Sequence, residues 1–315
     1  MTDQKILLET GTNEVEVLEF YLGEQSFGVN VLKVRRLLKH ESESTTAVPD
    51  SHTSIMGTFI YQGVSTTLID LNRHLKRGGA EGTVRRKIIL ICEFNNTLNG
   101  FLVDGVNRIH RLSWKSIQSA PVVIEQSQPR VTGVAHIEDR EVMMLDFENV
   151  IGDIVGNFDP TPAIEREALQ KQDQIQGRQT VKVFIAEDSW MYQEWLVEQL
   201  KAVGYQEVTA FNNGAELYNA VMALPTKTSS QEDLRNRVDI VVADIEMPQM
   251  DGLTLCKKLK ETFPDLPVVI LSSLASEELA LQCESVAADG YFTKKQFPRL
   301  LKRMDQLVLP GKGTH

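Results

Sequence analysis

Between residues 181 and 309 the sequence repeats one pattern five times: a short apolar run followed by a longer segment with helical spacing. The runs are residues 181–186, 208–211, 238–243, 267–271 and 290–292, and the helical segments are residues 189–203, 214–224, 253–263, 276–287 and 297–309. Five strand–helix pairs in this order predict a parallel sheet with helices on both of its faces.

The first half of the chain has a different rhythm, with many short β-rich runs separated by turn residues. These runs are residues 15–22, 67–71, 87–94, 131–137 and 141–147. Asn and Gly residues between them tolerate positive φ angles and favour tight turns. The pattern predicts a barrel or sandwich. We also expect one helix around residues 31–39.

The two halves are joined by a stretch with the composition of a linker. Pro160 and Pro162 lie near its start, and residues 165–172 are polar on almost every side, so they cannot bury a face. We therefore predict a first domain at 1–155, a linker at 156–179 and a second domain at 180–315. Residues 225–237 are polar and long for a loop, which indicates an exposed insertion.

The charge and the N-terminus exclude several classes of protein. The formal net charge is −10, so the chain would repel the phosphates of nucleic acid or of an anionic membrane. The N-terminus lacks the basic start and apolar core of a signal peptide, and no apolar run approaches the ~18–20 residues of a membrane span. Three cysteines without paired spacing fit a reducing compartment. We expect a cytoplasmic protein that neither inserts into the membrane nor binds nucleic acid.

Functional side chains follow four of the five predicted strands of the second domain. Glu187 and Asp188 follow the first strand, Asp244 the third, Ser272 the fourth and Lys294 the fifth. In a parallel sheet with helices on both faces, ligands bind at the carboxyl ends of the strands. These side chains should therefore converge at one edge of the sheet.

The converging groups predict a particular chemistry. Three carboxylates repel one another unless a hard divalent cation holds them, and Mg²⁺ prefers such oxygen ligands. Lys294 and Ser272 can contact the oxygens of a phosphoryl group. Asp244 then has the surroundings of a nucleophile, with a metal on one side and a neutralising cation on the other.

The order and spacing of these residues resemble the receiver domain of two-component response regulators. The resemblance covers residues 180–309 and rests on residues 183–188, residues 244–252, residues 271–273 and Lys294. It implies a flavodoxin-like (βα)5 fold. It also implies that Asp244 accepts a phosphoryl group from a histidine kinase, and that Glu187, Asp188, Asp244 and the backbone carbonyl of Glu246 bind Mg²⁺.

By the same resemblance, Ser272 and Lys294 contact the phosphoryl group and Tyr291 is an aromatic switch that follows Ser272. The chain differs from the usual receiver pattern at two positions. Lys295 stands where a proline usually follows the lysine, and Glu246 places a carboxylate beside the phosphorylation site, where many receivers carry a neutral or smaller residue. We expect Glu246 to alter the rates of phosphorylation and dephosphorylation.

The first half resembles the CheW-like coupling domain of bacterial chemotaxis, in residues 55–71, 103–114 and 131–137. A CheW-like domain joined to one C-terminal receiver is the arrangement of CheV proteins. The resemblance implies a pair of small SH3-like β-barrels. It further implies binding to the cytoplasmic tips of chemoreceptors and to the regulatory domain of the histidine kinase, which is also the phosphodonor.

Together these features predict a chemotaxis adaptor that couples chemoreceptors to the kinase, is recruited to membrane-bound receptor arrays, and is modulated by phosphorylation at Asp244. One alternative is a phosphate sink that drains the kinase without altering the coupling. Another is an aspartyl-phosphate phosphatase of the haloacid dehalogenase type, since Asp244 and Glu246 are two residues apart. For the adaptor we expect no enzyme activity beyond its own phosphoryl transfer and slow autodephosphorylation.

Overall fold

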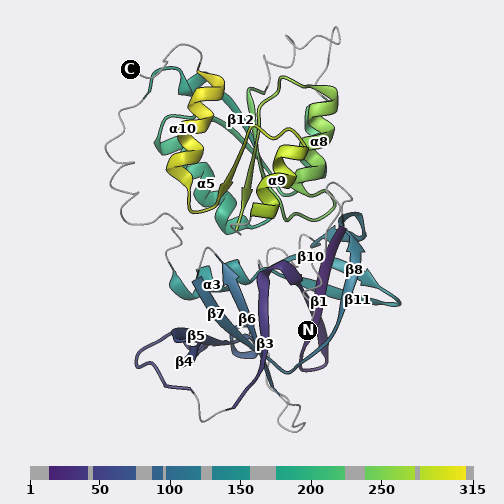
Figure 1. Ribbon diagram of the computed structural model, residues 1–315, viewed down its shortest axis with the longest axis vertical. Helices are drawn as coiled ribbons and strands as arrows, with labels where there is room; N and C mark the ends of the chain where they lie inside the picture. Colours follow the sequence, from purple (N-terminus) through teal and green to yellow (C-terminus); the bar gives the residue numbers. More distant parts are fainter. Residues whose placement is uncertain are drawn as a thin grey trace. The chain divides into compact units, whose positions relative to one another are not determined.

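The computed structural model describes residues 14–41, 45–75, 87–94, 97–121, 130–156, 175–223, 238–273 and 277–309 (Figure 1). The chain divides into two compact units, one within residues 15–157 and one formed mainly by residues 158–315. Most of the expected linker at 156–179, and all of the predicted insertion at 225–237, lie outside the described residues. No helix among the described residues is long and apolar enough to cross a membrane.

The N-terminal unit is built from two mainly antiparallel sheets. Its strands are β1 (Glu14–Leu22), β2 (Gln25–Asn30), β3 (Val34–Lys39), β4 (Ile55–Tyr61), β5 (Val64–Asp70), β6 (Ile88–Phe94), β7 (Thr97–Val103), β8 (Gly105–Ser113), β9 (Ile117–Ser119), β10 (Val131–Ile137) and β11 (Arg140–Leu145). The sheet orders are β8-β1-β2-β11-β10-β9 and β3-β6-β7-β5-β4. Its helices are η1 (Val31–Lys33), α1 (Leu71–His74), η3 (Trp114–Ser116) and α3 (Phe147–Val155).

One apolar core joins the two sheets of this unit. Phe20 and Phe27 come from the first sheet, Leu90 and Phe101 from the second, and Phe147 from the first turn of α3. The ring of Phe147 lies 5.9 Å from that of Phe20 and 4.3 Å from that of Phe101, measured between centroids. Burial of such rings is the main favourable term for a small β-rich domain. The strand-rich architecture predicted for this half is confirmed.

The prediction of a helix around residues 31–39 is wrong. The chain makes only the short η1 there and then continues as β3, which pairs antiparallel with β6, so that Leu37 lies opposite Leu90. Val31 and Val34 are β-branched and lose side-chain freedom in a helix. The paired β6, which lies some fifty residues away in the sequence, therefore decides the conformation.

A buried carboxylate lies on β1 of the first sheet. Glu19 is fully buried, accepts hydrogen bonds from Arg140 and from Asn107 Nδ2 (2.9 Å), and has His110 Nε2 2.8 Å away. Burial alone would raise the pKa of this carboxyl, but the hydrogen bonds from Arg140, His110, Ser26 and Asn107 outweigh burial and lower the pKa to about 2.

Glu19→Gln is expected to lower the free energy of unfolding of the first domain by about 2–3 kcal/mol at pH 7. Because the folded-state pKa lies below the unfolded one, this contribution is present above about pH 5 and is lost as the pH falls toward about 2. Urea denaturation of wild type and variant from pH 7 to pH 3.5 measures it. Glu24→Gln, at an exposed turn, is the control. A wild-type-to-variant difference independent of pH would contradict the prediction.

The C-terminal unit is a five-stranded parallel sheet in the order β13-β12-β14-β15-β16. Its strands are β12 (Lys182–Ala186), β13 (Glu207–Phe211), β14 (Ile240–Asp244), β15 (Val268–Ser272) and β16 (Gly290–Thr293). Its helices are η4 (Arg178–Thr180), α5 (Trp190–Ala202), α6 (Gly214–Met222), α8 (Gly252–Thr262), α9 (Glu277–Ser285) and α10 (Phe297–Val308). This is the flavodoxin-like strand order, and the predicted (βα)5 fold is confirmed.

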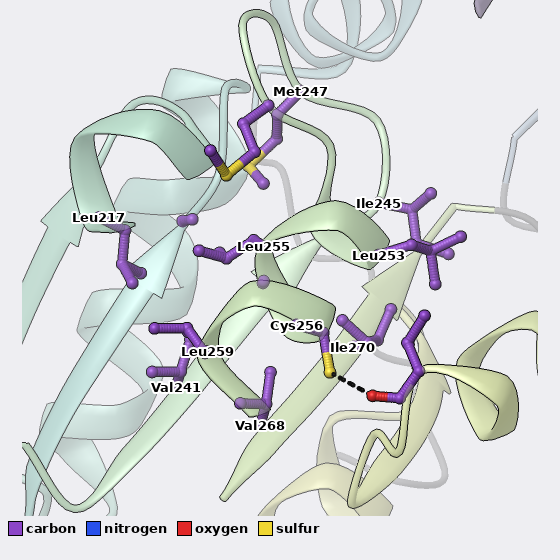
Figure 2. Packing of buried hydrophobic residues seen from close by; sticks show 14 of the residues in the cluster. Leu217, Val241, Ile245, Met247, Leu253, Leu255, Cys256, Leu259, Val268 and Ile270 are labelled. Atoms are coloured by element: carbon purple, nitrogen blue, oxygen red, sulfur yellow. Dashed lines mark hydrogen bonds between the residues drawn. The ribbon is translucent and has the colours of Figure 1, made fainter. Parts of the chain in front are cut away.

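Each face of this sheet is covered by its own apolar layer. Figure 1 shows α5 and α10 on one side of the sheet and α8 and α9 on the other. Figure 2 shows the second layer, in which Leu217, Leu255 and Leu259 pack over Val241 and Ile270. The central strands β14 and β15 are buried along their whole length, which explains their continuous apolar runs.

A buried ion pair ties the start of this unit to its last helix. Arg178 is 1% exposed, and its guanidinium donates to both carboxylate oxygens of Asp305 on α10, at 2.8 and 2.6 Å. It also donates to the carbonyl of Val203 at 2.8 Å, and the hydroxyl of Tyr205 donates to Asp305 at 2.8 Å. The segment entering the sheet is therefore fixed on α5 and α10.

Candidate functional site

Three carboxylates meet at the carboxyl ends of β12 and β14. Ligand oxygens of Glu187, Asp188 and Asp244 all lie within 4.8 Å of one another, the one such group of three metal-ligating side chains among the described residues. Glu187 and Asp244 are buried, and Asp188 is half-buried. The structure thus brings together the three side chains that the strand-end pattern selected.

Lys294 lies against two of these carboxylates. Its ammonium is 2.8 Å from Glu187 Oε1 and 3.3 Å from Asp244 Oδ2, and the residue is 2% exposed. Its backbone N–H donates to the carbonyl of Ser272 at 2.9 Å, which places it directly after β16. Lys294 is therefore the fixed cation of the cluster.

The surroundings of the Glu187 carboxylate favour the binding of a second cation in addition to Lys294. Burial, and then the charges of Asp244 and Asp188, raise its pKa well above the usual range, although Lys294 acts in the opposite direction. Its Oε1 accepts hydrogen bonds from Lys294 and from the backbone of Ser189, whereas its buried Oε2 has no hydrogen-bond partner among the residues that the structure describes. A buried carboxylate oxygen without a partner, beside two other carboxylates, fits the oxygen ligands of Mg²⁺.

The backbone around Asp244 is held by a close glycine contact. A Cβ on Gly252 would lie 2.2 Å from the carbonyl oxygen of Asp244, so only glycine allows the first turn of α8 to pack there. The Gly252 N–H donates to the carbonyl of Ile245 at 3.0 Å, and Asp251 caps α8 by accepting from Thr254 at 2.8 Å. The loop after β14 is thereby fixed directly beside Asp244.

The other expected site residues lie near this edge of the sheet. Ser272 is the last residue of β15 and is 1% exposed, while Tyr291 on β16 is half-buried and packs against the apolar layer of Figure 2. Glu246 follows Asp244 in the loop and is half-buried. Burial lowers the pKa of Lys295, which is also half-buried. The roles assigned to these residues stay predictions.

Two residues of α5 support the site and were not identified from the sequence. The hydroxyl of Tyr192 donates to the carbonyl of Lys294 at 3.1 Å. Gln193 donates from Nε2 to the carbonyls of Glu187 and Phe211, at 2.9 and 3.1 Å. Both lie within the first turn after the acidic pair, which is the signal that could have indicated them.

The arrangement can carry out a nucleophilic attack by Asp244 on an electrophile that brings negative oxygens with it. Lys294 neutralises charge on one side, and the carboxylate cluster can hold a divalent cation on the other. A phosphoryl group is such an electrophile, because its phosphorus carries negatively charged oxygens.

Comparison with known proteins gives two family matches. Residues 16–155 match the CheW-like domain, and residues 183–305 match the response regulator receiver domain. Over 309 residues the chain is 27% identical to the chemotaxis protein CheV3 of Helicobacter pylori, covering 94% of this chain and 95% of that protein. It is 26% identical to CheV2 of the same organism, with 90% and 91% covered. The crystal structure of the scaffolding protein TtCheW from Thermoanaerobacter tengcongensis covers 42% of this chain and 88% of its own, at 24% identity and a TM-score of 0.39.

Proposed function

Because the chain belongs to the CheV type, a CheW-like domain followed by a receiver domain, we propose that its coupling of chemoreceptors to the histidine kinase is modulated by phosphorylation of Asp244. The relatives support a chemotaxis coupling adaptor that carries a receiver, acting with chemotaxis receptors and their kinase. The observation that carries the proposal is the contact of buried Lys294 with Asp244 and Glu187 inside a cluster of three carboxylates.

The proposed reaction is a phosphoryl transfer to Asp244. A carboxylate oxygen of Asp244 attacks the phosphorus of a phosphohistidine, an O–P bond forms, and the P–N bond to the kinase imidazole breaks, so the imidazole leaves with the bond's electron pair and takes up a proton. Lys294, 3.3 Å from Asp244 Oδ2, is placed to receive a phosphoryl oxygen. The hydroxyl of Ser272 is proposed to donate a hydrogen bond to a second phosphoryl oxygen.

Glu187, Asp188 and Asp244 would hold Mg²⁺, with the backbone carbonyl of Glu246. The ion, when bound, neutralises charge on the phosphoryl oxygens. CheW-like and receiver domains are not catalytic in the usual sense, and the chemistry proposed here is confined to the chain's own phosphorylation and slow autodephosphorylation.

The acyl phosphate adds negative charge beside Ser272 and biases the position of Tyr291. A local charge of this kind shifts the equilibrium between two conformations only if it interacts more favourably with one of them than with the other. Tyr291 is half-buried on β16 and packs against the apolar layer of that face. We propose that this change alters how the CheW-like domain engages the receptor tips and the kinase regulatory domain. The adaptor would be cytoplasmic and recruited to membrane-bound receptor arrays through these partners.

The test measures binding of the full chain to a chemoreceptor cytoplasmic fragment and to the kinase regulatory domain. Each titration is run with and without Mg²⁺ plus beryllofluoride, which mimics the acyl phosphate. Asp244→Asn removes the acceptor. Asp289→Asn is the matched control, because this aspartate binds Lys260 and the Val268 N–H at the amino end of β16.

We expect both partners to bind the wild type, with affinities that shift on adding the mimic in wild type and Asp289→Asn but not in Asp244→Asn. If the affinities do not change when the mimic is added, the proposed modulation by phosphorylation is wrong, and the phosphate sink is favoured instead. Absence of binding to both partners would overturn the adaptor.

A further inference from the structure

Tyr192 contacts Lys294 at both ends of the lysine. Its hydroxyl donates to the backbone carbonyl of Lys294 at 3.1 Å, and the ammonium of Lys294 lies 4.6 Å from the centroid of its ring. Tyr192 is 1% exposed, so its ring is shielded from water. One side chain on α5 thus touches both the backbone and the charge of the residue that follows β16.

Backbone hydrogen bonds also hold the chain on either side of Lys294. The Lys294 N–H donates to Ser272, and the next turn is closed by the Gln296 N–H donating to the carbonyl of Thr293 at 2.8 Å. The following residue is Lys295, which lacks the ring that limits the backbone of a proline. The hydrogen bond from Tyr192 on α5 to the Lys294 carbonyl restricts the backbone conformation at this same position.

The ring also favours one direction for the ammonium. A cation is attracted to the face of an aromatic ring, and the attraction grows when water is excluded. With the ring on one side, the ammonium donors face Glu187 Oε1 and Asp244 Oδ2, at 2.8 and 3.3 Å. The charge is thus held ready before any phosphoryl group arrives.

We propose that Tyr192 is a positioning residue for phosphoryl transfer, which holds the Lys294 ammonium toward the acceptor Asp244 through its ring and its hydroxyl. This inference rests on the proposed phosphorylation of Asp244. A purely structural role is the alternative, because Tyr192 also packs 5.3 Å from the ring of Trp195 in the apolar layer under α5 and α10.

The experiment uses the full chain and two variants of this tyrosine. Tyr192→Phe removes the hydroxyl and keeps the ring, whereas Tyr192→Leu removes both. Tyr205→Phe is the matched control, because Tyr205 is fully buried in the same apolar layer and donates its hydroxyl to Asp305 instead. Calorimetry measures the affinity for Mg²⁺ alone and for beryllofluoride in saturating Mg²⁺, and thermal denaturation measures stability.

We expect Tyr192→Leu to weaken beryllofluoride binding about tenfold and Tyr192→Phe about threefold, because each loses contacts to Lys294. Mg²⁺ affinity should not fall in either variant. Tyr205→Phe should lower stability and leave beryllofluoride affinity unchanged. If Tyr192→Leu does not fold, Tyr192→Phe still decides the question.

A second readout separates positioning from packing. In a Lys294→Met background the backbone carbonyl that Tyr192 contacts remains, but no ammonium is left to position, so Tyr192→Phe should no longer change the rate of phosphorylation by acetyl phosphate. Wild-type beryllofluoride affinity in both Tyr192 variants, or an undiminished effect in the Lys294→Met background, would overturn the inference. A wild type that binds no beryllofluoride would instead overturn the proposed phosphorylation itself.

Discussion

Exchanging Lys294 for methionine is expected to slow phosphorylation by acetyl phosphate roughly 10²–10³-fold, the usual loss when one preorganised charge is removed from developing negative oxygens. The same change should tighten Mg²⁺ binding about tenfold, since it removes a positive charge that lies 2.8 Å from Glu187 Oε1 and competes for the carboxylates. The two expected effects have opposite signs, because the ammonium of Lys294 would stabilise a phosphoryl group but would repel a metal cation.

Both quantities can be measured on the full chain, with Mg²⁺ affinity from calorimetry and phosphorylation from the shift in mass of the chain. Asp244→Asn sets the background rate, because it lacks the acceptor. Lys260→Met is the matched control, since Lys260 pairs with Asp289 at 2.6 Å at the other end of the sheet. A Lys294→Met variant that loses Mg²⁺ affinity would show that the ammonium supports the metal site rather than opposing it.

Arg178→Ala is expected to lower the free energy of unfolding of the second domain by about 3–5 kcal/mol, the usual cost of breaking a buried ion pair on one side only. Asp305 would keep the hydroxyl of Tyr205 but lose both guanidinium contacts, and the carbonyl of Val203 would lose its donor. Arg178→Lys keeps the charge but cannot form the two-pronged contact, so its loss should be intermediate.

Urea denaturation followed by tryptophan fluorescence measures the change, because Trp190 and Trp195 both lie on α5. Lys302→Ala is the control, since Lys302 is exposed on the same helix as Asp305 and its removal should change stability by less than about 0.5 kcal/mol. Equal losses in Arg178→Ala and Lys302→Ala would show that the buried pair contributes no more than an exposed charge.

The second domain could be predicted from its sequence because its pattern is local. Its central strands are continuous apolar runs, and Glu187, Asp244 and Lys294 each lie at or directly after the end of a strand, so the topology rule for parallel sheets places them together without knowledge of any contact. Their chemical roles are a separate matter and stay predictions, because proximity alone does not show which ligand is bound.

The residues that the sequence did not indicate act through distant partners. Apart from its place in the first turn after the acidic pair, Tyr192 resembles any apolar residue on the inner face of a helix, and its contact with Lys294, 102 positions away, connects it to the site. Arg178 and Asp305 are 127 positions apart. The strand β3 was mistaken for a helix for the same reason, since its conformation is set by pairing with β6.

The side chains of the site lie at the ends of parallel strands, which long crossover segments connect along the chain. Glu187 and Lys294 are 107 residues apart. Contacts of this range form late, because the entropy of closing long loops must be overcome before they contribute. A newly made chain with β16 still undocked has Asp244 but lacks Lys294 beside it. On the proposed function, acceptance of a phosphoryl group by Asp244 would therefore be a property of the finished sheet, and partly folded or truncated copies would accept none.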